Sequence, residues 1–246
     1  MNFFHAVNAS VSAPVAPSIP IITTGLYVYL DADNSTSYPG TGTTWYDLSG
    51  NNKNGTLING TSFDSVNKAF DFDGVNDYVD INLSNAPVYS IQVWAYLLTT
   101  ITNQTPRMGL LRYNNSGGQE GISFGNTTSQ VPRERLTMMH STSNPQTFYR
   151  TAQNTTNINA GWHNFVFNWN GTKYDIFMDG IKYLTSSGSQ TDVPFIYSNE
   201  IFLGQDFLST LPFFQGKQSV FALYTSSLTD AEVVSNFNAL RGRYGL

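Results

Sequence analysis

The sequence contains no cysteine, which excludes disulfide bonds, thiolate nucleophiles and zinc held by cysteine ligands. It has 12 lysine and arginine residues against 17 aspartate and glutamate residues, so it lacks the basic surface that neutralises nucleic-acid phosphates. It also lacks an apolar run of the ~18–20 residues that a membrane-spanning helix needs. We therefore expect neither nucleic acid nor a membrane among its partners.

Charge of either sign is scarce, because charged residues make up 12% of the 246 residues, about half of the usual share. Aromatic residues reach 14%, and much of the remainder is Asn, Thr, Ser and Gly. Asn, Ser and Gly disfavour helices, whereas aromatic residues and Thr favour strands. The composition therefore excludes a long helical bundle and favours strands joined by tight turns.

Residues 1–22 are predicted to form an extended N-terminal arm that precedes one domain of residues 23–246. Pro14, Pro17 and Pro20 recur at a spacing of three, which is typical of a polyproline-like tether. Two interpretations stand: the arm packs on its own domain, or it binds a neighbouring subunit, which we prefer. In the second case the binding residues are the apolar ones, Phe3, Phe4, Val7, Ile19, Ile21 and Ile22.

The body of the chain alternates short apolar segments with turn residues. The expected strands are residues 26–30, 69–73, 78–82, 89–97, 108–113, 122–124, 135–140, 162–169, 173–178, 181–184, 200–203 and 219–224. Asn-Gly at 170–171 and Asp-Gly at 179–180 predict a three-stranded meander, and Gly74 predicts a hairpin between residues 69–73 and 78–82. Many short strands without β-α-β alternation predict an all-β, antiparallel two-sheet jelly-roll sandwich.

One helix is expected near the C-terminus. Thr229 and Glu232 have the spacing of a capping box, and Val233, Phe237 and Leu240 line one face. Gly242 is the expected end signal. We expect this short helix to pack on the sandwich.

Several segments together resemble concanavalin A-like, laminin-G-like jelly-roll domains. They are F-D-G-V-N-D-Y-V at residues 72–79, the meander from G-W-H-N-F-V at 161–166 to Asp-Gly at 179–180, the closing strand and helix at 219–237, and the opening at 38–57. The resemblance covers about residues 25–246. The family includes lectins, glucanases, adhesion modules and bacteriophage structural proteins, and the opening and the ending at 241–246 look most like the bacteriophage copies.

Glucanases of this superfamily carry paired carboxylates on one strand as Glu-x-Asp-x-(x)-Glu. The four glutamates here, Glu120, Glu134, Glu200 and Glu232, do not occur in that pattern. Retaining hydrolysis needs two carboxyl groups about 5–5.5 Å apart. We therefore expect no enzymatic activity, and we expect His163, beside Trp162, to be a structural residue of its strand.

Two binding sites are candidates. Glycan binding needs exposed aromatic rings beside amide side chains, and the candidates are Trp45, Tyr113, Asn114 and Asn115. Trp45 also lies in the opening segment at 38–57, where the resemblance to the family implies a structural role instead. Carboxylates crowd the turn around Gly74, where Asp73 and Asp77 offer the oxygen ligands that calcium prefers. The alternative at this turn is hydrogen bonding of Asx turns.

The leading hypothesis is a non-enzymatic bacteriophage virion protein, either a capsid decoration or a tail or fibre appendage. Its arm would bind other virion proteins, its copies would form a homo-oligomer within the assembly, and host polysaccharide would be a further partner. No cofactor other than calcium is expected. The alternative is a carbohydrate-binding, lectin-like module of a secreted or cell-surface protein.

Overall fold

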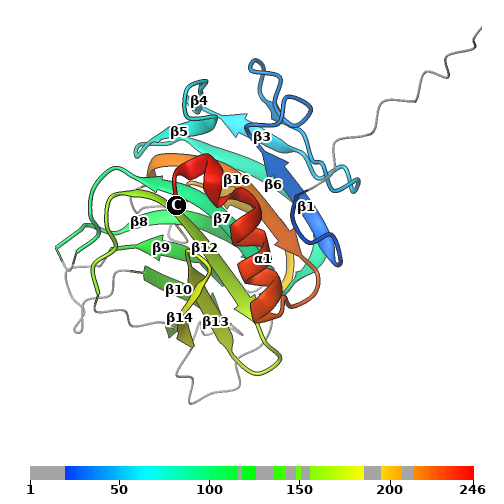
Figure 1. The fold of residues 1–246 in the computed structure, drawn as a ribbon, viewed down its shortest axis with the longest axis vertical. Coiled ribbons are helices and arrows are strands. Elements are labelled where there is room, and N and C mark those ends of the chain that lie inside the picture. The colour runs from blue at the N-terminus through cyan, green and yellow to red at the C-terminus, as the bar shows by residue number, and fades with distance from the viewer. Residues whose placement is uncertain are drawn as a thin grey trace, which may run out of the picture.

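The computed structural model describes residues 20–102, 104–115, 118–125, 136–141, 148–150, 156–185, 195–206 and 213–246. Two antiparallel sheets face each other (Figure 1). Sheet A has the order β14 (Ile181–Thr185), β13 (Tyr174–Met178), β12 (Gly161–Trp169), β7 (Ser90–Leu97), β16 (Gln215–Tyr224), β5 (Ala69–Asp73) and β4 (Ser62–Asp64), and β1 (Leu26–Asp31) also pairs with β16. Sheet B has the order β11 (Phe148–Arg150), β10 (Leu136–Ser141), β9 (Gly118–Phe124), β8 (Met108–Asn115), β15 (Phe195–Leu203), β6 (Tyr78–Val88), β3 (Gly55–Ile58) and β2 (Thr44–Trp45). The predicted two-sheet sandwich is confirmed.

The main core lies between the two sheets. Along β6, Val79, Ile81 and Leu83 are fully buried in this core, whereas the residues between them face away from it. The same period of two places Ile201 and Leu203 of β15 in the core. The outer face of sheet B is therefore set by the alternation of its strands.

A second core covers the outer face of sheet A. The helix α1 (Asp230–Leu240) lies across β7, β12 and β16 (Figure 1) and buries Val233, Phe237 and Leu240 against Trp94. This cover explains why β7 is buried on both faces although its sequence alternates. No helix in the described ranges is long and apolar enough to cross a membrane.

The capping box of α1 has both of its predicted hydrogen bonds. The Glu232 amide donates to Thr229 Oγ1 over 3.2 Å, and the Thr229 amide donates to the Glu232 carboxylate over 2.8 Å. The expected end at Gly242 is not observed, because a 3-10 turn, η1 (Arg241–Tyr244), continues the helix. Gly245, at a φ of 73°, ends it instead.

The turn at Gly74 is not the predicted hairpin. β5 belongs to sheet A and β6 belongs to sheet B, so the chain crosses between the sheets here. The Asp77 carboxylate accepts the amide of Asp73 over 3.1 Å and that of Gly60 over 2.8 Å, and Gly74 has a φ of 82°. A tight hairpin and such a crossing use the same turn residues, so the local sequence does not separate them.

The N-terminal arm lies mostly outside the described residues, and so do Phe3, Phe4, Val7 and Ile19. Ile21, only 5% exposed, is part of the second core. The Ile22 amide donates to Asn236 Oδ1 of α1 over 2.8 Å. Both isoleucines therefore pack on their own domain, which differs from the expectation that they contact a neighbouring subunit.

His163 of β12 is held between two acceptors. Its Nδ1 lies 2.8 Å from Asp179 Oδ2 and its Nε2 lies 3.0 Å from the Asn159 carbonyl oxygen. Neither partner donates to a ring nitrogen, so this geometry favours the imidazolium, which donates from both. Burial lowers the pKa of His163, but the hydrogen bond and charge of Asp179 and the bond to Asn159 raise it more, and the net direction is upward.

We expect this histidine to make stability fall with rising pH. A folded-state pKa above the unfolded value of about 6.5 adds stability that is complete below pH ~6.5 and is lost as the pH rises through the folded pKa. The free energy of unfolding, measured by urea titration from mildly acidic to mildly alkaline pH, should decline in that window. The variant His163→Gln should show a flatter profile there, and an equally steep profile in the variant would contradict the assignment.

Candidate functional site

The outer face of sheet B gathers charged and aromatic side chains from three neighbouring strands. Phe202 of β15 is in register with Arg112 of β8 on one side and with Asp80 of β6 on the other. Glu200 and Tyr78 lie two residues along on β15 and β6. We call these five residues the sheet B surface.

The guanidinium of Arg112 covers the ring of Phe202, with its central carbon 4.4 Å from the ring centroid. The Tyr78 ring lies 5.9 Å from that of Phe202 at an angle of 72°, and Phe202 is left 8% exposed. Arg112 Nε is buried and has no hydrogen-bond partner among the described residues. A buried donor without a partner costs roughly 1–3 kcal/mol, so a ligand acceptor that reaches this N–H after a small shift of the Arg112 side chain would relieve that cost.

Two charged side chains of the sheet B surface, Asp80 and Arg112, are partly buried, which perturbs their pKa values. Burial raises the pKa of Asp80, and the nearby negative charge of Glu200 raises it further against the opposing effect of Arg112. Burial lowers the pKa of Arg112, while Glu200, Tyr78 and Asp80 act to raise it. Groups perturbed by burial and by specific charged neighbours concentrate at functional sites. Donors, acceptors and aromatic rings in one row suit a ligand with many hydroxyl groups.

A groove at the end of the sandwich adjoins the sheet B surface. We call it the end groove; its volume is about 450 Å³, within the usual range of ligand pockets. Apolar and polar side chains both line it, including Leu98, Met108, Phe213, Asp73, Thr105 and Gln215. The Phe213 ring lies 6.5 Å from the Tyr78 ring, so the groove continues into the sheet B surface.

One wall of the end groove contains Arg107, whose Nε lies 2.8 Å from Asp206 Oδ2. The side chains of Arg107 and Asp206 are 8% and 0% exposed. Such a buried ion pair fixes the geometry of the wall, because losing either partner would take a close opposite charge from the other.

The two aromatic residues predicted to bind glycan lie elsewhere. Trp45 is fully buried, with its ring centroid 4.7 Å from that of Phe70, and Tyr113 is 1% exposed within the main core. Neither ring can stack on a sugar, so these two predictions are wrong. Residues of β8 alternate, and Tyr113 faces the core because Arg112 faces outward. Asn114 and Asn115 end β8, and their side chains lie outside the described part of the structure.

The predicted calcium ligands are occupied by backbone amides. The Asp73 carboxylate accepts the amides of Val75 and Asn76, over 2.7 and 3.3 Å, and the Asp77 carboxylate holds the crossing between the sheets. Among the described residues, no three His, Asp or Glu side chains lie close enough together to hold a metal. The hydrogen bonds have the pattern of the Asx-turn alternative, and calcium binding stays a prediction.

Sequence reasoning did not single out Arg112 or Phe202. It considered Asp80 only among the carboxylates near the Gly74 turn, Tyr78 only within the family motif, and Glu200 only as a catalytic candidate. A signal existed in the alternation of residues 78–83, in which polar side chains fall on one face. The sequence does not reveal that β15 lies between β6 and β8, because these strands are distant along the chain.

Comparisons with known proteins agree with this architecture. A family model described as the concanavalin A-like lectin/glucanases superfamily matches residues 72–234. None of the curated proteins compared with the chain matches it.

Solved structures match at low identity. Domain 4 of AbnA, an extracellular arabinanase from Geobacillus stearothermophilus, solved with arabinotriose, has a TM-score of 0.59 and 16% identity over 85% of this chain and 96% of that domain. The receptor-binding domain of botulinum neurotoxin D has a TM-score of 0.62 and 11% identity over 88% of this chain and 53% of that chain. Trypanosoma rangeli sialidase in complex with sialic acid has a TM-score of 0.59 and 13% identity over 96% of this chain and 36% of that chain. The chain thus spans about half of the neurotoxin domain, and these likenesses concern the fold.

Proposed function

Since the chain belongs to the concanavalin A-like lectin/glucanase superfamily, we propose that it is a carbohydrate-binding domain whose ligand lies on the sheet B surface and in the end groove. The observation that carries the proposal is the buried Nε of Arg112, a donor without a partner among the described residues, between Asp80 and Glu200 and over an aromatic ring. The arabinotriose complex of the AbnA domain, nearly all of which this chain spans, supports the ligand class.

The proposed role is binding without hydrolysis. Asp80 and Glu200 belong to different strands, whereas the glucanase pattern places its carboxylates along one strand. No step of the role needs a metal or another cofactor. Release of reducing sugar from a bound polysaccharide would contradict this part of the proposal.

We expect Arg112→Met to weaken glycan binding at least tenfold, because hydrogen bonds to a charged group contribute about 1.5–3 kcal/mol. A glycan array would identify the ligand, and calorimetry would compare the variant with the natural chain. Arg241→Met is the matched control, since Arg241 also lies over a phenylalanine ring, 5.7 Å from the centroid of Phe237, but at the start of η1 and away from the sheet B surface. Circular dichroism would verify that both variants are folded.

Two outcomes contradict the proposal. The first is an array on which the natural chain binds no glycan. The second is an Arg112→Met variant that is folded and binds as tightly as the natural chain.

A second candidate concerns the biological setting, a bacteriophage virion on which the domain is a capsid decoration or a tail appendage. Supporting observations are the apolar, proline-spaced sequence before Ile21 and the anchoring of Ile21 in the second core, which would tie that segment to the domain. Other virion proteins would bind the segment, and carbohydrate binding would attach the particle to host polysaccharide. Mass spectrometry of purified virions tests this setting, and failure to find the chain in them would rule it out.

A further inference from the structure

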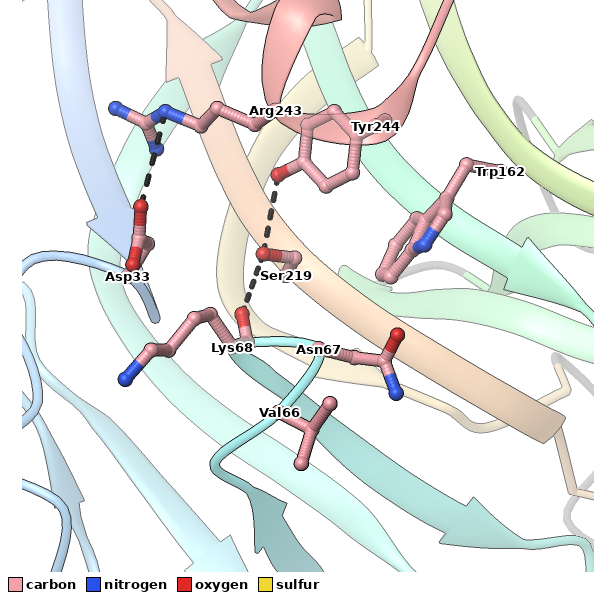
Figure 2. A pocket seen from close by; sticks show the side chains of 8 residues that line it. All are labelled: Asp33, Val66, Asn67, Lys68, Trp162, Ser219, Arg243 and Tyr244. Carbon is pink, nitrogen blue, oxygen red and sulfur yellow. Dashed lines mark hydrogen bonds and ion pairs between the residues drawn. The ribbon is translucent and has the colours of Figure 1, made fainter.

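A second cleft lies on the side of sheet A, away from the sheet B surface. The turn between β4 and β5, the start of β12, β16 and η1 surround it (Figure 2). Its volume is about 130 Å³. Its lining includes Asp33, Asn67, Lys68, Trp162, Arg243 and Tyr244. We call it the η1 cleft.

The floor of the η1 cleft is a chain of partly buried hydrogen bonds. The Tyr244 hydroxyl donates to Ser219 Oγ over 3.0 Å, and the Ser219 hydroxyl donates to the Lys68 carbonyl oxygen over 2.6 Å (Figure 2). Burial raises the pKa of Tyr244, so its hydroxyl stays protonated and continues to donate. The Tyr244 ring also stacks on Trp94 at 4.2 Å. The cleft is therefore held in shape before any ligand arrives.

Two cations, Lys68 and Arg243, line this cleft beside one carboxylate, that of Asp33. Arg243 uses Nη1 alone on the two carboxylate oxygens of the buried Asp31, over 2.9 and 2.8 Å, and its Nε lies 4.0 Å from Asp33. A third of the Arg243 side chain remains exposed. The ammonium of Lys68 has no carboxylate partner among the described residues. A ligand that complements this cleft must therefore supply acceptors, preferably with negative charge.

Trp162 forms the opposite wall from Arg243 and Asp33 (Figure 2). Its ring packs on Tyr244 at 4.7 Å and is only partly buried. The other three tryptophans of the chain, Trp45, Trp94 and Trp169, are at most 5% exposed. An accessible indole across the cleft from the two cations offers an apolar surface to a ring whose substituent is anionic.

We propose that the η1 cleft binds a carboxylate-bearing sugar, such as one uronic acid residue of an acidic polysaccharide. The sugar ring would lie against Trp162, and its carboxylate would accept hydrogen bonds from Lys68 and from the unused N–H groups of Arg243. The small volume admits one sugar residue, with the remaining residues in solvent. This site shares no residue with the sheet B surface and does not depend on the function proposed for it.

The test uses the full chain and two probes of equal length, trigalacturonate and neutral galactotriose. Acrylamide quenches exposed tryptophan fluorescence, so the quenchable signal belongs to Trp162, and Trp162→Phe should remove it. Trigalacturonate should protect this signal from quenching in a saturable way that weakens at high salt, whereas galactotriose should not. Acrylamide is uncharged and does not compete for the cations.

Lys68→Gln should raise the Kd of trigalacturonate about tenfold, since it removes a charged hydrogen-bond donor. Lys173→Gln is the control, because it makes the same charge change at an exposed turn between β12 and β13. Arg112→Met should leave this Kd unchanged, which separates the result from that on the sheet B surface. Equal protection by both probes, no saturable protection, or an unchanged Kd in Lys68→Gln would each overturn the proposal.

Discussion

Replacing Asp206 by alanine should lower the free energy of unfolding by about 3–5 kcal/mol, the usual cost of leaving one buried charge without its partner. Asp206 has a fully buried side chain, and Arg107 beside it is 8% exposed. Without the carboxylate, the guanidinium loses this close opposite charge and must either stay buried at a cost or pull out of the groove wall. Urea titration of the natural chain and of Asp206→Ala measures the difference.

A double variant and a surface pair make this prediction specific. Arg107→Met combined with Asp206→Leu should recover much of the loss, because apolar residues of similar volume replace a buried pair at little cost. Asp230→Ala breaks the ion pair with Lys182, whose side chains are 63% and 38% exposed, and should cost about 1 kcal/mol or less. A similar small loss in Asp206→Ala would show that the pair contributes little.

Trp45→Ala should destabilise the domain by about 3–5 kcal/mol, the usual cost of removing a buried tryptophan from a core. Trp45 has no exposed surface and packs on Phe70. The next residue, Tyr46, is 45% exposed, so Tyr46→Ala should change stability by no more than about 0.5 kcal/mol. Thermal and urea denaturation of the two variants compare a buried and an exposed aromatic residue at adjacent positions.

This result also separates two interpretations of the same residue. If Trp45 were a sugar-stacking ring, Trp45→Ala would stay folded and lose only glycan binding. A variant whose melting temperature matches that of the natural chain would therefore contradict the buried position. Loss of stability in Trp45→Ala, together with unchanged stability of Tyr46→Ala, supports the buried position.

Local features of this fold were predictable because their causes lie within a few residues. The meander from β12 to β14 follows from Asn170, Gly171, Asp179 and Gly180, whose backbones accept tight turns. The capping box of α1 needs only residues three positions apart. The crossing at Gly74 was missed because it is decided by which sheet each strand joins, a choice made by distant partners.

The candidate site was missed for the same reason. Arg112, Phe202 and Asp80 become neighbours only when β15 inserts between β6 and β8. Tyr113 was expected to be exposed because it stands among Asn and Gly residues, yet the alternation of β8 turns it inward. Aromatic residues beside amides in a sequence therefore do not identify a sugar platform until the face of the strand is known.

The second core makes the two outer faces of the sandwich different. Ile21 and η1 both pack on the outer face of sheet A, so the described chain enters and leaves the domain on that side. The sheet B surface lies on the other side of the sandwich. A domain fastened at either end, to a solid support or to a larger particle, would therefore point its sheet B surface outward into the surrounding medium.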